Sequence, residues 1–147
     1  VWECGGYWHL DTRMEEYDYI SNNEWGSLKK IALAIDKRMK DGVSSKHRVL
    51  CHGDFKEANL LFKPLTDGSY ECAAVDFQYA GYGYGLKDVV MLVVSSIAPS
   101  LLRGSGERNL LEYYFKELCR SLDCLGKHHS GFCIEDIITQ YEVSTFK

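Results

Sequence analysis

Long apolar runs are missing from this sequence. The longest, Val89–Val94, is far shorter than the stretch of about 18 apolar residues that crosses a membrane. A basic excess is missing too, since 17 Lys and Arg stand against 21 Asp and Glu, a formal net charge of −4. That balance is not typical of a nucleic-acid-binding protein, and the charge is too low for a disordered tail. We therefore predict no membrane partner and no nucleic-acid partner.

No CxxC pair occurs among the six cysteines, and no apolar signal segment is present. Reduced cysteines in a cytoplasmic protein are therefore expected. A zinc site is an alternative, and its candidate ligands are Cys124, His128, His129 and Cys133. Their spacing matches no common zinc finger, so we favour surface histidines beside a glycine loop.

Hydrophobic periodicity predicts three helices. In the first, the apolar residues fall at steps of three and four on one face, which is expected to point into the core: Trp25, Leu28, Ala32, Ile35 and Met39. Similar stripes predict helices over residues 107–122 and 135–146. Residues 88–97 are also apolar, but their pattern leaves helix and strand open, with Asp88 as a cap at the start.

Short apolar runs predict strands at residues 48–51, 60–63 and 70–77. Residues 64–69 contain Asp67-Gly68 and are expected to join the last two strands as a hairpin turn. The segment 76–88 is expected to be a flexible loop, because its alternating glycines and tyrosines are not followed by a phosphate-binding signature.

The stretch most informative about chemistry is His-Gly-Asp-Phe-Lys-Glu-Ala-Asn at residues 52–59. Asp54 and Asn59 lie on one tight loop, and the predicted hairpin can carry Asp76 back beside it. Two carboxylates and an amide are hard oxygen ligands suited to Mg²⁺. Phosphoryl transfer needs such a set, with one Asp at the acceptor hydroxyl and an Asn and a second Asp holding the metal. Lys56 can stabilise charge on the transferring group.

These residues resemble the motifs of a known family. Residues 52–59 resemble the HGDxxxxN motif of the aminoglycoside phosphotransferase and choline-kinase-like families, within the protein-kinase-like superfamily. Val75-Asp76-Phe77-Gln78, with Asp76 lying 22 residues after Asp54, resembles the metal-binding motif of the ecdysteroid-kinase-like branch. Gly81, Gly85 and Asp88 resemble the element that follows it. The resemblance covers about residues 24–143.

The resemblance implies a role for each matching residue. Asp54 is expected to be the catalytic base, with Lys56 contacting phosphate. Asn59 and Asp76 are expected to bind Mg²⁺ and, through it, ATP. Two further residues are expected to support the loop, namely His52 by holding it and Asp88 by accepting hydrogen bonds from its backbone.

The resemblance also implies an α+β, protein-kinase-like fold, of which this chain is the mostly helical C-terminal lobe with a catalytic-loop β-hairpin. The sequence has no GxGxxG loop and no VAIK-type strand Lys, and it begins at Val1 and ends inside an expected helix. We therefore expect the N-terminal lobe to be absent, so that residues 1–147 form one partial domain with little activity alone. Residues 24–147 are expected to form the lobe core and residues 1–23 a hinge-proximal or substrate-side segment.

The predicted function is ATP- and Mg²⁺-dependent transfer of the γ-phosphate to a hydroxyl of a small molecule, such as an amino alcohol, an aminoglycoside-like or a sterol-like acceptor. The alternative is an inactive pseudokinase or a binding module on the same lobe. A protein kinase is disfavoured by Gly53 and Gln78, which replace the Arg and Gly of the protein-kinase motifs. A phosphoesterase would need further His and Asp motifs, which are absent from the sequence.

Overall fold

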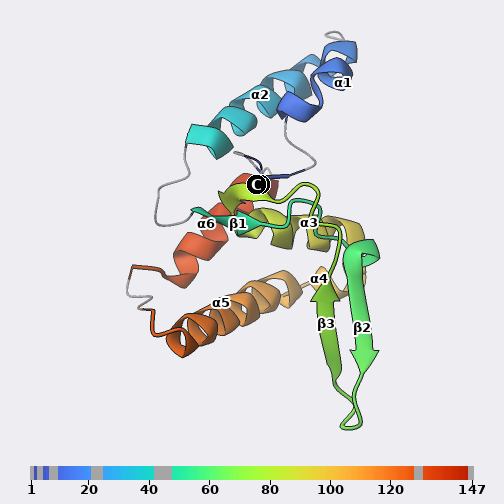
Figure 1. The fold of residues 1–147 in the computed structure, drawn as a ribbon. Coiled ribbons are helices and arrows are strands. Elements are labelled where there is room, and N and C mark those ends of the chain that lie inside the picture. Colours follow the sequence, from blue (N-terminus) through green and yellow to red (C-terminus); the bar gives the residue numbers. More distant parts are fainter. Residues whose placement is uncertain are drawn as a thin grey trace.

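The structure, a computed structural model, describes residues 2, 5–6, 10–20, 25–41, 48–127 and 131–145. Within these residues six α-helices accompany two antiparallel two-stranded sheets, which confirms the predicted α+β class (Figure 1). The elements in chain order are η1 (Leu10–Thr12), α1 (Met14–Tyr19), α2 (Gly26–Asp41), β1 (Arg48–Cys51), η2 (Glu57–Asn59), β2 (Leu60–Pro64), β3 (Tyr70–Ala74), β4 (Gly81–Tyr84), α3 (Leu86–Ser96), α4 (Pro99–Leu102), α5 (Gly106–Cys124) and α6 (Ile134–Thr145).

The hydrophobic core lies where α3, α5 and α6 meet (Figure 1). Its buried side chains come from all three helices, namely Leu86, Val93, Leu111, Ile137 and Tyr141. The apolar stripes of α5 and α6 pack into this cluster. The two helices predicted from those stripes are therefore confirmed, together with the faces they bury.

The apolar segment that the sequence left open between helix and strand is the helix α3. Leu86 and Val93, two turns apart, both face the core. The N-cap position is Gly85, which has no side-chain hydrogen bond, and Asp88 lies in the first turn. The prediction that Asp88 caps this segment is therefore wrong, because its carboxylate turns towards another element.

Helix α2 confirms the first predicted helix but not its burial. It lies with α1 at one end of the molecule, apart from the centre of the α3, α5 and α6 core (Figure 1). Trp25 is 54% exposed and Leu28 is 51% exposed, so neither is a core residue as predicted. The reason is that α2 packs against η1, β4 and α6 at the edge of the molecule and contributes none of its described side chains to the core cluster. The side chain of Met39 lies outside the described residues.

Strand β4 pairs antiparallel with β1, from Arg48 opposite Tyr84 to Cys51 opposite Gly81. The predicted flexible loop at 76–88 is therefore wrong for residues 81–84, and also for residues 86–88, which begin α3. Strand β4 was not predicted because its glycines lower its strand propensity and because its partner, β1, lies about 30 residues earlier in the chain. The strand predicted at 48–51 is confirmed.

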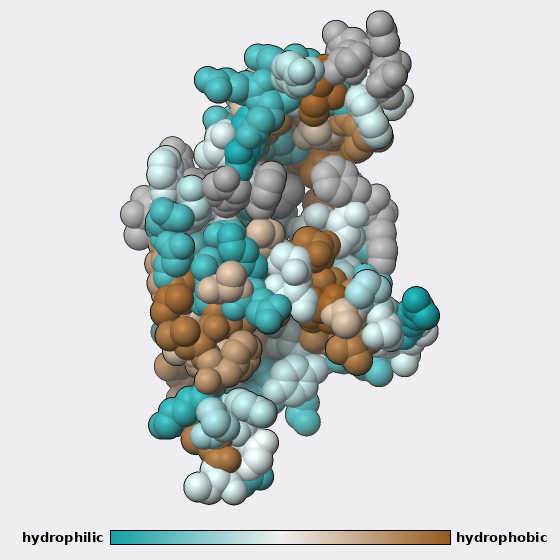
Figure 2. Space-filling model, turned by 90° about the vertical axis from the view of Figure 1, so that its right-hand side faces the viewer, coloured by the Kyte–Doolittle hydropathy of each residue, from teal (hydrophilic) through white to brown (hydrophobic). Residues whose placement is uncertain are grey.

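The β2–β3 hairpin projects from the helical body (Figure 1). Strand β3 ends at Ala74, three residues before the predicted end, because Asp76 has a φ of 65° that no extended strand accommodates. The hairpin leaves large side chains exposed, including Leu61 (58%) and Phe62 (57%). Figure 2 shows apolar areas between polar ones on this side of the molecule.

Among the described helices, none has the length and apolar character needed to cross a bilayer.

Helices α5 and α6 are joined by a hydrogen bond between a tyrosine and a glutamate. The Tyr141 hydroxyl donates to Oε1 of Glu107 at 2.7 Å. Burial, and then this carboxylate, raise the pKa of Tyr141 well above its usual value, because both disfavour the phenolate. The folded state therefore keeps a proton that the unfolded chain loses near pH 10.

We predict that the stabilisation from this tyrosine is complete below about pH 10 and is lost as the pH rises further. In urea titrations the stability advantage of the wild type over Tyr141→Phe should shrink above that pH. Tyr113→Phe is the control, because Tyr113 lies on the same helix pair but is 65% exposed. Stability curves that stay parallel for wild type and Tyr141→Phe would contradict the assignment.

Candidate active site

The predicted catalytic loop joins β1 to β2 and ends in the short 3₁₀ turn η2. Three of its polar side chains are buried, namely His52 (6% exposed), Asp54 (4%) and Asn59 (7%). Polar groups are usually buried only when other groups hydrogen-bond them, because their desolvation is costly. The hydrogen-bond partners of these three side chains therefore need to be identified one by one.

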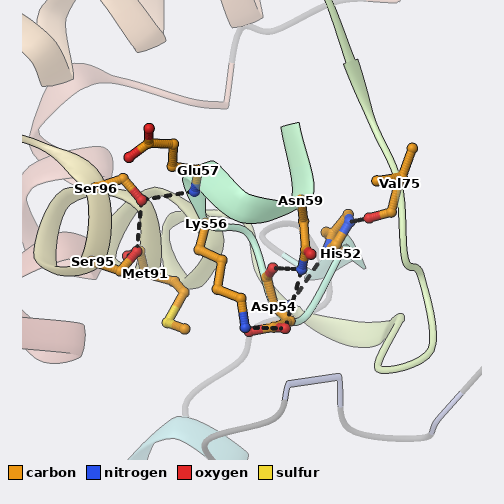
Figure 3. Close-up of polar contacts among 9 residues, drawn as sticks. All are labelled: His52, Asp54, Lys56, Glu57, Asn59, Val75, Met91, Ser95 and Ser96. Atoms are coloured by element: carbon orange, nitrogen blue, oxygen red, sulfur yellow. Dashed lines mark hydrogen bonds and ion pairs between the residues drawn. The ribbon is translucent and has the colours of Figure 1, made fainter. Parts of the chain in front are cut away.

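Asp54 lies at the centre of these contacts (Figure 3). Its Oδ2 is 2.8 Å from Nζ of Lys56 and accepts a hydrogen bond from Nδ2 of Asn59 at 3.1 Å. The same Asn59 nitrogen donates to the main-chain oxygen of Asp54 at 2.8 Å. The other carboxylate oxygen, Oδ1, is buried and has no hydrogen-bond partner among the described residues. One oxygen of this carboxylate is thus engaged and the other is available to a donor.

His52 connects the loop to the segment that carries Asp76. Its Nε2 lies 2.8 Å from the carbonyl oxygen of Val75, and its Nδ1 lies 3.3 Å from the backbone N–H of Asp54. Since that N–H can only donate, Nδ1 accepts and Nε2 carries the proton given to Val75. The imidazole also packs on the Phe77 ring, with centroids 4.4 Å apart. These contacts join the loop to Val75 and Phe77, and the role of His52 in holding the loop stays a prediction.

Asp76 follows directly on these contacts. The Val75 N–H donates to the carbonyl oxygen of Asn59 at 3.0 Å, while the Val75 carbonyl accepts from His52. The structure therefore brings the backbone at Asp76 beside the loop of Asp54 and Asn59. The Asp76 side chain is exposed and its residue adopts the left-handed conformation, with φ of 65°. Such a backbone at a non-glycine residue is uncommon and is found at functional sites.

The backbone of the loop is held by Asp88 of α3. Its Oδ2 accepts the His52 N–H at 2.6 Å and its Oδ1 accepts the Gly53 N–H at 2.9 Å. These are the hydrogen bonds that the resemblance implied. Gly53 has a φ of 89°, and a Cβ there would collide with the Tyr79 carbonyl. Only glycine fits this close approach.

We predict that Asp88→Asn lowers the free energy of unfolding by ~1.5–3 kcal/mol, the range for hydrogen bonds to a charged group. The Asn side chain keeps one oxygen that can accept one of the two loop N–H groups. Its NH₂ group would face the other N–H, and two donors cannot form a hydrogen bond with each other. Denaturant unfolding measures the change, with Glu112→Gln on the exposed side of α5 as the control. Equal stability of Asp88→Asn and this control would show that the two hydrogen bonds do not hold the loop.

The oxygen donors fit Mg²⁺. The Asn59 side chain uses its nitrogen to hydrogen-bond Asp54, so its amide oxygen is available to a cation. No hydrogen bond or ion pair joins Asp76 to the described residues. These are hard oxygens of the kind that Mg²⁺ prefers. In the part of the chain that the structure describes, no group of three or more His, Cys, Asp or Glu side chains is placed to hold a metal ion. Two of the zinc candidates, His128 and His129, lie outside it.

Some contacts of the loop were not predicted. The Glu57 N–H donates to Oγ of Ser96 at 2.8 Å, and nothing in the sequence marks that serine. The N-terminal segment also reaches the site, since Gly6 N–H donates to the Tyr79 carbonyl and the Trp2 indole donates to that of Gln78. In the sequence, only the aromatic and acidic composition of this segment suggested that it could lie near the site. Tyr7 and Trp8 lie outside the described residues.

Comparison with protein families identifies the class. The model of the ecdysteroid kinase-like family matches residues 9–127, which is most of the chain. The chain therefore belongs to the ecdysteroid kinase-like family, a family of small-molecule kinases related to choline kinases and aminoglycoside phosphotransferases. Membership implies a kinase-like phosphotransferase. No curated protein and no solved structure matches the chain.

Proposed function

We propose that this chain carries the catalytic loop of an ATP- and Mg²⁺-dependent kinase that phosphorylates a hydroxyl of a small molecule. The observation that carries the proposal is the Asp54 carboxylate, buried with Oδ2 held by Lys56 and Asn59 and with Oδ1 unpartnered in the described structure. A buried acceptor without a donor costs free energy, which an acceptor hydroxyl would recover. Because Oδ1 is shielded, the hydroxyl reaches it only after neighbouring side chains shift.

In the proposed reaction, Asp54 orients the acceptor hydroxyl and takes its proton. The acceptor oxygen forms a bond to the γ-phosphorus, the bond from that phosphorus to the bridging oxygen breaks, and ADP leaves with the electron pair. Lys56, whose ion pair with Asp54 supports this role, stabilises negative charge on the transferring group. The residues that would hold the metal are Asn59 and Asp76. Bound Mg²⁺ would neutralise charge on the nucleotide phosphates.

We expect the acceptor to belong to one of four classes: alcohols, amino alcohols, amino sugars and sterols. The full-length protein should be incubated with Mg²⁺, γ-labelled ATP and each of these classes in turn. Transfer of label to one class, with the product identified by mass spectrometry, is the expected result. Omission of Mg²⁺ is the control and should abolish transfer.

Two outcomes would overturn the proposal. Binding of Mg²⁺-ATP without transfer to any acceptor class would favour the pseudokinase or binding-module alternative. Failure to bind Mg²⁺-ATP at all would overturn the metal roles proposed for Asn59 and Asp76. The two outcomes are separated by a titration with a fluorescent ATP analogue in the presence and absence of Mg²⁺.

A further inference from the structure

Helix α3 contacts the catalytic loop at both of its ends. In its first turn, Asp88 accepts the N–H groups of His52 and Gly53. At its last residue, Oγ of Ser96 accepts the N–H of Glu57 at 2.8 Å. The two anchors are eight residues apart on the helix, which corresponds to about 12 Å at 1.5 Å per residue. A helix keeps this spacing, so it holds the loop segment between its anchors in place.

The Ser96 anchor belongs to a hydrogen-bond chain with a defined direction (Figure 3). The Ser95 hydroxyl donates to the carbonyl oxygen of Met91 at 2.6 Å. Having one proton, it can only accept from Ser96, whose oxygen lies 2.9 Å away. Ser96 Oγ is then left to accept the Glu57 N–H. Each hydroxyl thus donates once and accepts once.

This anchor is adjacent to the proposed catalytic pair. Glu57 follows Lys56 directly, and Lys56 Nζ lies 2.8 Å from Asp54 Oδ2. The backbone at Lys56 is extended, with φ of −135° and ψ of 164°, so it leads straight from the anchored residue to the ion pair. A shift of the Glu57 amide therefore moves the point from which the Lys56 side chain reaches Asp54.

We infer that Ser96 is a positioning residue for phosphoryl transfer, acting through the Glu57 amide to hold Lys56 against Asp54. The inference rests on the proposed function for its effect on rate. The hydrogen bond itself can be tested without any acceptor. Asp88 then holds the start of the loop and Ser96 holds its end.

The first test compares Ser96→Ala with Ser96→Thr and Ser100→Ala in the full-length protein. Ser96→Ala should lower kcat about tenfold, within the ~10²-fold that a misplacement of 1 Å can cost, with KM for ATP little changed. Ser96→Thr keeps the hydroxyl and should recover most of the rate. Ser100 is exposed on α4, so Ser100→Ala should leave kcat unchanged. A kcat for Ser96→Ala equal to that of Ser100→Ala would overturn the inference.

The second test measures hydrogen exchange of the Glu57 amide by NMR, with no acceptor present. Exchange should be faster in Ser96→Ala than in wild type and should be restored in Ser96→Thr. Unchanged exchange would overturn the anchor even if kcat falls. A wild type that transfers no phosphate to any acceptor would refute the proposed function instead, and the anchor would then be judged on exchange alone. Equal thermal midpoints of Ser96→Ala and wild type would show that the fold is intact.

Discussion

Replacing Asp54 by Asn is expected to lower the rate of phosphoryl transfer in the full-length protein by at least ~10²-fold, the scale on which a general base contributes. The side chain is 4% exposed and is held on Oδ2 by Lys56 and Asn59. Asn has nearly the same shape but cannot take the acceptor proton, and its amide nitrogen would face either the Lys56 ammonium or the shielded Oδ1 position. KM for ATP should change little, because Asp54 is proposed to serve the acceptor.

The measurement is the initial rate with saturating ATP and the acceptor found by screening. Asp67→Asn is the matched control, since it is the same substitution at an exposed hairpin turn and should retain the wild-type rate. Far-UV circular dichroism establishes that both variants are folded. An Asp54→Asn enzyme within tenfold of wild type would show that another group takes the proton.

Replacing Asp76 by Asn is expected to reduce transfer by more than ~10²-fold, as when a charge-stabilising group is removed, and to raise the Mg²⁺ concentration needed for half-maximal ATP binding. The substitution isolates the charge, because Asn tolerates the left-handed backbone that Asp76 adopts at φ of 65°. Asp76→Asn removes a proposed metal ligand, whereas Asp54→Asn removes the proposed base. The two variants should therefore differ in how their activity depends on Mg²⁺.

Titration of Mg²⁺ at fixed ATP measures this difference. Asp54→Asn should keep the wild-type midpoint, whereas Asp76→Asn should move it upwards. Glu71→Gln removes an exposed carboxylate from β3, the strand that precedes Asp76, and serves as the control. A wild-type Mg²⁺ midpoint in Asp76→Asn would exclude Asp76 as a metal ligand.

Local patterns were enough to predict most of the secondary structure. Helices α2, α5 and α6 follow from steps of three and four between apolar residues, and the β2–β3 hairpin follows from two apolar runs around Asp67-Gly68. They were predictable because neighbours along the chain decide them. Strand β4 and the exposed position of Trp25 were not predicted, since each depends on which distant segment packs against it.

The candidate site divides in the same way. The order and spacing of the residues at 52–59 and 75–78 were sufficient to indicate the kinase family, because a chemical mechanism restricts residue type at each position of a motif. Their roles in this chain remain proposals. The contacts of Asp88 with the loop were implied only by resemblance, whereas those of Ser96 had no sequence signal at all.

The sequence by itself thus determined the α+β class, helices α2, α5 and α6, the hairpin and the family. Only the tertiary structure decided that Val75 links Asn59 to His52, that Asp54 keeps one buried oxygen without a partner among the described residues, and that α3 holds the loop at both ends. The physical reason is distance along the chain. Ser96 lies 39 residues from Glu57, and a hydrogen bond across that separation depends on how α3 packs rather than on either residue's neighbours.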